Sequence, residues 1–144
     1  MLLCEIKSTV PYSWTEQSND YCEAEFMVED GFYRVGFTLI QSKTDEAFWN
    51  VEFQMLNGTT QDEHGNVGYG DEGVGYGPSV FGLVITIVKE WINHMHPTYA
   101  KFEAQTPKRA QLYAKLVRAI RQPNWQVSTQ TKGEATAFII KVQN

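Results

Sequence analysis

The sequence predicts a single α+β domain in which a mixed, mainly antiparallel sheet packs against two main helices, in the order β-β-β-α-β-α-β-β. Three observations support this fold class. Residues 21–56 largely alternate between apolar and polar side chains, as strands with one solvated face do. Residues 80–92 form a mostly apolar helical pattern, and residues 108–122 form an amphipathic one. A length of 144 residues is typical of one domain, so we expect residues 1–144 to form one unit.

Three strands are expected in the first half of the chain, at residues 21–29, 32–40 and 47–56. A tight hairpin at residues 30–31, Asp-Gly, joins the first two. The result is an antiparallel meander, and a further short strand is expected near residues 2–7. The side chains that alternate toward one face are Cys22, Ala24, Phe26, Val28, Tyr33, Val35, Phe37, Leu39, Trp49, Val51, Phe53 and Met55.

A glycine-rich loop at residues 57–77 precedes the first helix. It is long for a compact domain, which indicates either a function or disorder. Pro78 and Ser79 supply the helix start, with Ser79 as the candidate N-cap. The helix is apolar around most of its circumference, so we expect it to be largely buried, and Pro97 ends it.

The remaining elements are a strand, a helix and two strands, at residues 99–105, 108–122, 125–130 and 134–142. Thr106 and Pro107 open the helix, and a turn at Lys132-Gly133 joins the last two strands. The core stripe of this helix is Tyr113, Leu116, Val117 and Ile120. Because a crossover helix returns the chain in the same direction, the strands before and after the first helix should be parallel.

Charge is distributed unevenly along the chain. Residues 1–72 hold 14 acidic and 3 basic side chains, whereas residues 73–144 hold 3 acidic and 9 basic ones. The basic side chains between positions 101 and 121 are either a solvated helix face or a site for an anionic ligand. They are Lys101, Lys108, Arg109, Lys115, Arg118 and Arg121. The net charge of -5 and the lack of a recognised motif disfavour nucleic-acid binding.

The cysteines and histidines suggest neither secretion nor a metal. Cys4 and Cys22 lack metal-ligand spacing and no signal peptide precedes them, so we expect a reducing cytoplasm. His94 and His96 are two positions apart on a helix and do not face each other, so no metal site is expected. Polar residues interrupt the apolar helix well short of the roughly 20 residues that a membrane span needs, so no membrane segment is expected.

This succession of elements resembles the GNAT superfamily of N-acetyltransferases over residues 21–142. More narrowly, "VITIVKEWI" followed by "KFEAQTPKRAQLYAKLVRAI" is similar to small bacteriophage-encoded proteins of acetyltransferase-like fold. Their second helix carries an Arg-Ala-x-Leu-Tyr-x-x-Leu pattern, which stands here as Arg109, Ala110, Leu112, Tyr113 and Leu116. The resemblance implies a phage-encoded protein in the host cytoplasm that uses acetyl-coenzyme A (acetyl-CoA) to acylate an unknown amine.

The resemblance also implies a pyrophosphate site at the start of the first helix. The backbone N–H groups that would hold the phosphates are those of Gly75, Gly77, Ser79 and Val80. The loop departs from the family signature of a Gln or Arg, two residues and a Gly-x-Gly or Gly-x-Ala. It also carries acids that would repel pyrophosphate, namely Asp62, Glu63, Asp71 and Glu72. A phosphate cradle and a plain loop both stay open.

Two side chains are catalytic candidates under this resemblance. Tyr113 occupies the place where many family members put a tyrosine that protonates the departing coenzyme A thiolate, and Glu52 is the candidate general base. The usual asparagine seven residues earlier is Thr106, and the usual Gly-Phe is Val117-Arg118. Tyr113 is therefore either the acid or a core residue. Glu52 is either buried, which would favour proton uptake, or solvated.

An alternative function is a catalytically degenerate member of this fold that binds and modulates a host protein. The acidic N-terminal half and the aromatic residues Tyr12, Trp14, Tyr69 and Tyr76 would then provide contact surface. One fold hosts many functions, so the fold alone does not choose between the two. The oligomeric state is not predicted.

Overall fold

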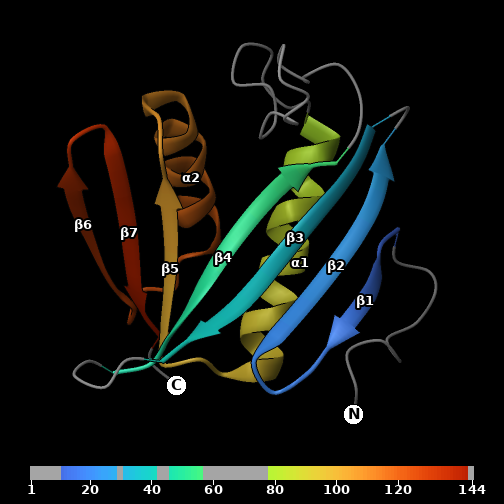
Figure 1. The fold of residues 1–144 in the computed structure, drawn as a ribbon, viewed down its shortest axis with the longest axis horizontal. Helices are drawn as coiled ribbons and strands as arrows, with labels where there is room; N and C mark the ends of the chain where they lie inside the picture. The colour runs from blue at the N-terminus through green and yellow to red at the C-terminus, as the bar shows by residue number, and fades with distance from the viewer. Residues whose placement is uncertain (1–10, 29–30, 42–45, 57–77, 143–144) are drawn as a thin grey trace.

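The computed structural model describes residues 11–28, 31–41, 46–56 and 78–142, and it shows one seven-stranded sheet with both helices behind it (Figure 1). The elements are β1 (Ser13–Gln17), β2 (Tyr21–Val28), β3 (Gly31–Ile40), β4 (Phe48–Met55), α1 (Pro78–Met95), β5 (Tyr99–Ala104), α2 (Pro107–Ile120), β6 (Gln126–Lys132) and β7 (Ala135–Lys141). Their order across the sheet is β1-β2-β3-β4-β5-β7-β6. Every neighbouring pair is antiparallel except β4 and β5, which confirms the α+β class and the parallel junction.

The predicted alternation in β2, β3 and β4 places one face of these strands in the core. Cys22, Val35 and Phe37 are all at most 1% exposed. Trp91 of α1 stacks on Phe37 with ring centroids 4.3 Å apart and meets Trp49 edge-on at 5.3 Å. Such aromatic burial supplies much of the driving force that holds a helix on a sheet.

Both helices lie on this same face, α1 over β2 and β3, and α2 over β5 and β7 (Figure 1). α1 begins at Pro78, so Ser79 lies inside its first turn and the predicted N-cap at Ser79 is wrong. Proline suits the first helical position because its fixed φ matches the helix and its missing N–H has no partner there anyway. α2 begins as predicted, with the Thr106 side chain accepting a hydrogen bond from the backbone N–H of Arg109.

The hairpin between β6 and β7 turns one residue later than predicted. Lys132 still pairs with Ala135, so the two-residue loop is Gly133 and Glu134. Gly133 has a φ of 64°, which a residue without a side chain adopts at little cost. Gly31 of the other predicted turn, at residues 30–31, is already part of β3 and pairs with Val28, whereas Asp30 lies outside the described residues.

Strand β1 is an element that the periodicity analysis does not predict. Its pairing with β2 buries Tyr12 and Trp14, which are 7% and 8% exposed. Both donate hydrogen bonds to Glu90 of α1. The prediction that Tyr12 and Trp14 form an exposed contact surface is therefore wrong. Tyr69, Tyr76, the strand expected near residues 2–7 and the loop at 57–77 lie outside the described residues.

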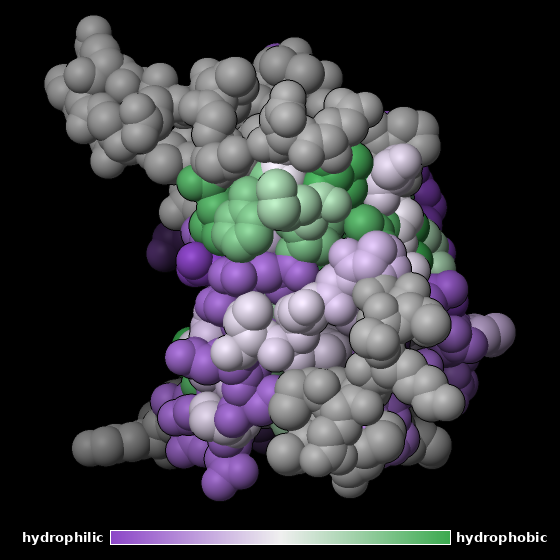
Figure 2. All heavy atoms as spheres, turned by 90° about the vertical axis from the view of Figure 1, so that its right-hand side faces the viewer, coloured by the Kyte–Doolittle hydropathy of each residue, from purple (hydrophilic) through white to green (hydrophobic). Residues whose placement is uncertain are grey.

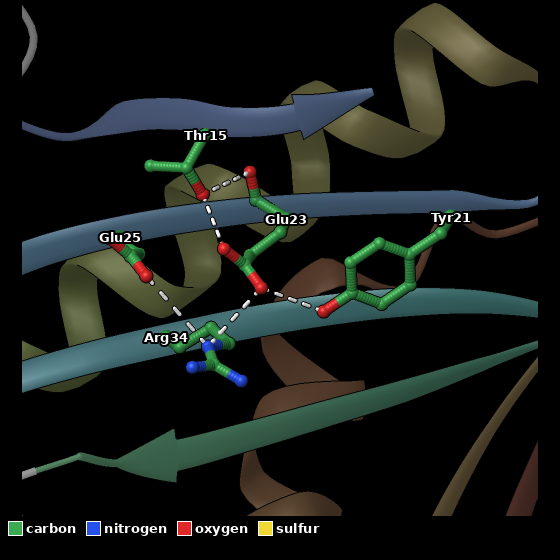
Figure 3. A network of polar contacts seen from close by, with 5 residues as sticks. All are labelled: Thr15, Tyr21, Glu23, Glu25 and Arg34. Atoms are coloured by element: carbon green, nitrogen blue, oxygen red, sulfur yellow. Dashed lines mark hydrogen bonds and ion pairs between the residues drawn. The ribbon is translucent and has the colours of Figure 1, made fainter. Parts of the chain in front are cut away.

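The face of the sheet opposite the helices carries a network of polar contacts on β1, β2 and β3 (Figure 3). Glu23 accepts hydrogen bonds from Thr15 and Tyr21, and its Oε1 lies 3.3 Å from the Arg34 Nε. Burial would raise the pKa of Glu23, but these hydrogen bonds and the Arg34 charge together hold it below its usual value. Burial and the neighbouring Glu23 charge raise the pKa of Glu25.

Seen from the β1 edge, hydrophobic side chains gather in one band above a mainly polar surface (Figure 2). Met27, at the end of β2, is 63% exposed and is the most exposed large hydrophobic residue in the described part of the chain. Single exposed apolar side chains are ordinary on protein surfaces, so Met27 by itself indicates no function.

Candidate functional site

The sheet opens between its two central strands. β4 and β5 pair only at Trp49–Ala100 and Asn50–Lys101, although both strands continue beyond these residues. Figure 1 shows them meeting at one end and diverging toward the other. The later part of β4 therefore turns backbone N–H and C=O groups toward a gap instead of toward β5. Backbone groups that are not in water need other partners.

Two side chains of α2 supply those partners at Phe53. The Phe53 N–H donates to the Tyr113 phenol oxygen at 3.4 Å, and the Phe53 carbonyl accepts from Arg109 Nη1 at 3.1 Å. Both contacts are buried, and both join residues more than fifty positions apart in the chain. Side chains from the helix face thus bridge the gap, which in a regular sheet would be closed by further hydrogen bonds between β4 and β5.

The first turn of α2 sets the position of these side chains. The Thr106 cap fixes the helix start, which places Arg109 and Tyr113 one turn apart on the same face. The Arg109 guanidinium carbon lies 5.8 Å from the centroid of the Tyr113 ring. Phe102 of β5 meets that ring edge-on, with centroids also 5.8 Å apart. Packing on two sides therefore fixes the ring.

A pocket of about 270 Å³ occupies the gap, and we call it the β4–β5 pocket. It is lined by Asn50, Glu52, Phe53, Glu103, Gln105, Arg109 and Tyr113. On β4, Glu52 alternates with the buried Val51 and Phe53, so its side chain lies on the face of the sheet away from the helices. Tyr113 enters from the helix face. The structure thus brings the two predicted catalytic candidates to one pocket, from opposite faces of the sheet.

The two candidates differ in environment. Tyr113 is 4% exposed, whereas Glu52 is exposed and accepts a hydrogen bond of 3.4 Å from the Asn50 amide. Burial raises the pKa of the Tyr113 phenol, and the positive charge of Arg109 and the Phe53 N–H oppose part of that rise. Tyr113 therefore holds its proton firmly. Of the two environments that the sequence leaves open for Glu52, buried or solvated, the structure shows the solvated one.

Arg109 is the residue of this site that the charge analysis assigns wrongly. It is 6% exposed, so neither a solvated face nor an open anion site describes it. Four of the other basic residues are exposed, as the solvated-face interpretation expects, namely Lys108, Lys115, Arg118 and Arg121. The helical spacing does indicate that Arg109 is buried, because position 109 lies one turn before Tyr113 on the core stripe of the helix.

The predicted cofactor-binding residues are placed only in part. Gly75 and Gly77 lie outside the described residues, whereas Ser79 is exposed and Val80 is buried in the first turn of α1. That turn contains no acidic residue. Within residues 11–28, 31–41, 46–56 and 78–142, no three His, Cys, Asp or Glu side chains gather as metal ligands, and neither helix is long and apolar enough to cross a membrane.

Comparison of the chain with protein-family models, with curated proteins and with solved structures finds no match.

Proposed function

We propose that this protein is an acyl-CoA-dependent N-acyltransferase of GNAT-like fold, phage-encoded and active in the host cytoplasm. The observation that supports it best is the β4–β5 pocket, where Glu52 and Tyr113 meet from opposite faces of the sheet. Acyl transfer to an amine needs one group that accepts a proton from the nucleophile and another that donates one to the leaving group. Because the pocket passes between two strands, the proton acceptor and the proton donor can lie on opposite faces of the sheet and still line the same pocket.

The pocket fits the reacting end of such a co-substrate. Its volume of about 270 Å³ lies just below the range of roughly 300–1,000 Å³ that holds drug-sized ligands, so it suits an acyl group and an amine and not a whole coenzyme. Its polar lining includes the Tyr113 phenol and the amides of Asn50 and Gln105. The remaining part of the coenzyme would lie toward the start of α1, with the backbone of Ser79, Val80 and the residues before them as contacts.

Each side chain has a defined task in this proposal. Bound acyl-CoA supplies an activated thioester carbonyl and a thiolate leaving group. Glu52, solvated at the mouth of the pocket, takes a proton from the ammonium form of the acceptor. Tyr113 holds a proton at Oη at the buried end, where a leaving thiolate would need it. Asn50 orients Glu52 through its amide hydrogen bond.

Isothermal titration of the full chain with acetyl-CoA tests the proposal. We expect saturable one-site binding in the micromolar range, which corresponds to about -8 kcal/mol. Free thiol release in the presence of polyamines or a lysine-containing peptide would then report turnover. No heat and no thermal shift at millimolar acetyl-CoA would contradict the proposal.

A second candidate function is protein binding by a catalytically degenerate member of the fold. The observation that favours it is the bridging of the gap at Phe53, where Arg109 and Tyr113 already engage the backbone groups that a ligand in the gap would meet. A protein of this kind would bind a host protein without acetyl-CoA. Pull-down from host lysate, combined with titration of the purified chain with acetyl-CoA, separates the candidates, because only the acyltransferase should bind acetyl-CoA.

A further inference from the structure

We propose that Arg109 is a positioning residue for Tyr113, which holds the phenol oxygen against β4 so that the phenol proton is directed into the β4–β5 pocket. The catalytic meaning of this role rests on the proposed acyltransferase function. The positioning itself rests on contacts among Arg109, Tyr113 and Phe53.

A phenol has one proton to donate and two lone pairs with which to accept. At Tyr113 the oxygen accepts from the Phe53 N–H at 3.4 Å, and the Arg109 guanidinium carbon lies 5.8 Å from the centroid of the phenol ring. With the Phe53 N–H on one lone pair, the phenol O–H still needs an acceptor of its own.

The carbonyl of Phe53 is a possible acceptor for the phenol proton, because it belongs to the same residue as the N–H that contacts the phenol oxygen. Arg109 Nη1 already donates to this carbonyl at 3.1 Å. One guanidinium thus lies beside the Tyr113 ring and donates to the carbonyl that would compete for the phenol proton. The planar fork of arginine permits this double contact, whereas a lysine ammonium is a single point of charge. The open direction for the O–H is the β4–β5 pocket, which Tyr113 lines together with Asn50 and Gln105 and where a ligand would lie.

A purely structural role predicts something different. An arginine that merely ties α2 to β4 acts on the phenol only through its charge, which favours the phenolate and which a lysine at position 109 keeps. A positioning role also needs the planar guanidinium that holds the phenol in place. The ionisation of Tyr113 in Arg109→Lys is therefore the readout that separates the two roles.

The test replaces the tyrosines of the full chain with 3,5-difluorotyrosine, whose phenol ionises at lower pH than tyrosine, and follows fluorine NMR signals against pH. Tyr113→Phe assigns the signal by its loss. We expect Arg109→Gln to move the ionisation midpoint of Tyr113 upward by about one pH unit or more. Arg118→Gln, an exposed arginine on the same helix, should leave it in place. An unchanged midpoint in Arg109→Gln would overturn the proposal.

A second variant covers a failure of Arg109→Gln to fold. Arg109→Lys keeps the charge but loses the double contact, so the midpoint should rise by a smaller, resolvable shift, and no rise overturns the proposal. The midpoints need no acetyl-CoA, so they decide the role of Arg109 even if the protein does not bind it. Where turnover is found, Arg109→Lys should lower kcat several-fold more than it changes KM, since Arg109 acts through Tyr113.

Discussion

The Tyr12 phenol donates a hydrogen bond of 2.6 Å to Glu90 Oε2, across 78 positions of the chain. The other carboxylate oxygen accepts from Trp14 Nε1 at 2.8 Å. A single carboxylate on α1 therefore fixes the edge strand β1 and the residue before it. Burial, the hydrogen bond and the charge of Glu90 all raise the pKa of Tyr12 above its ordinary value.

Replacing that carboxylate should loosen β1. Glu90→Ala leaves the Tyr12 and Trp14 donors without an acceptor, so we expect the free energy of unfolding to fall by about 2 kcal/mol. Urea denaturation measures the change. Lys89→Ala alters the exposed neighbouring position and should stay within about 0.5 kcal/mol. Equal stability of the two variants would show that the Glu90 contacts contribute nothing.

Alkaline pH should weaken the fold partly through Tyr21. Burial, followed by the hydrogen bond to Glu23, raises the pKa of Tyr21 from 10.0 to about 12. Because the folded pKa lies above the unfolded one, this contribution is complete below pH 10 and is lost as the pH rises toward 12. Denaturation of the parent and of Tyr21→Phe across this window should show a shallower decline in the variant. Parallel curves would contradict the assignment.

Two glycines should respond in opposite directions to alanine. A Cβ on Gly31 would lie 2.5–2.7 Å from atoms of Tyr33, whose ring stacks with Phe26 and Phe53 and cannot easily move. Gly31→Ala should therefore destabilise the protein by about 1–3 kcal/mol. Gly82, inside α1, has no atom within 4 Å of the added carbon, so Gly82→Ala should stabilise by about 0.5–1 kcal/mol. Thermal denaturation of both variants measures the contrast.

Turnover, once an acceptor is identified, should depend on Glu52. Glu52→Gln removes the base while keeping the size of the side chain, and loss of general base catalysis lowers kcat by about 10²–10⁴-fold. Glu46→Gln changes an exposed carboxylate that does not line the pocket, and its kcat should equal that of the parent. If both variants turn over at the parental rate, another group takes the proton.

The sequence predicts the elements far better than the site. Strands β2 to β4 and both helices follow from apolar periodicity, which depends only on residues near one another in the chain. The periodicity does not predict strand β1, because the strand is short and its contacts with α1 run through Glu90, more than seventy positions away.

The pocket could not be predicted in the same way. It exists because β4 and β5 separate after Asn50, and the pairing register of two strands separated by a helix is not visible in either strand. Tyr113 and Glu52 were suggested by resemblance. The charge pattern predicts a solvated or anion-binding Arg109, and although helical spacing places it on the core stripe, its partner, the Phe53 backbone, has no sequence signature.

The two residue pairs that join β4 to β5 also divide the sheet into two ladders, β1 to β4 and β5 to β7. Beyond these pairs, the Phe53 contacts of Arg109 and Tyr113 link the first ladder to α2, which packs on β5 and β7. A ligand that enters beside Tyr113 and takes over the Phe53 backbone groups would therefore remove a link between the two halves of the sheet.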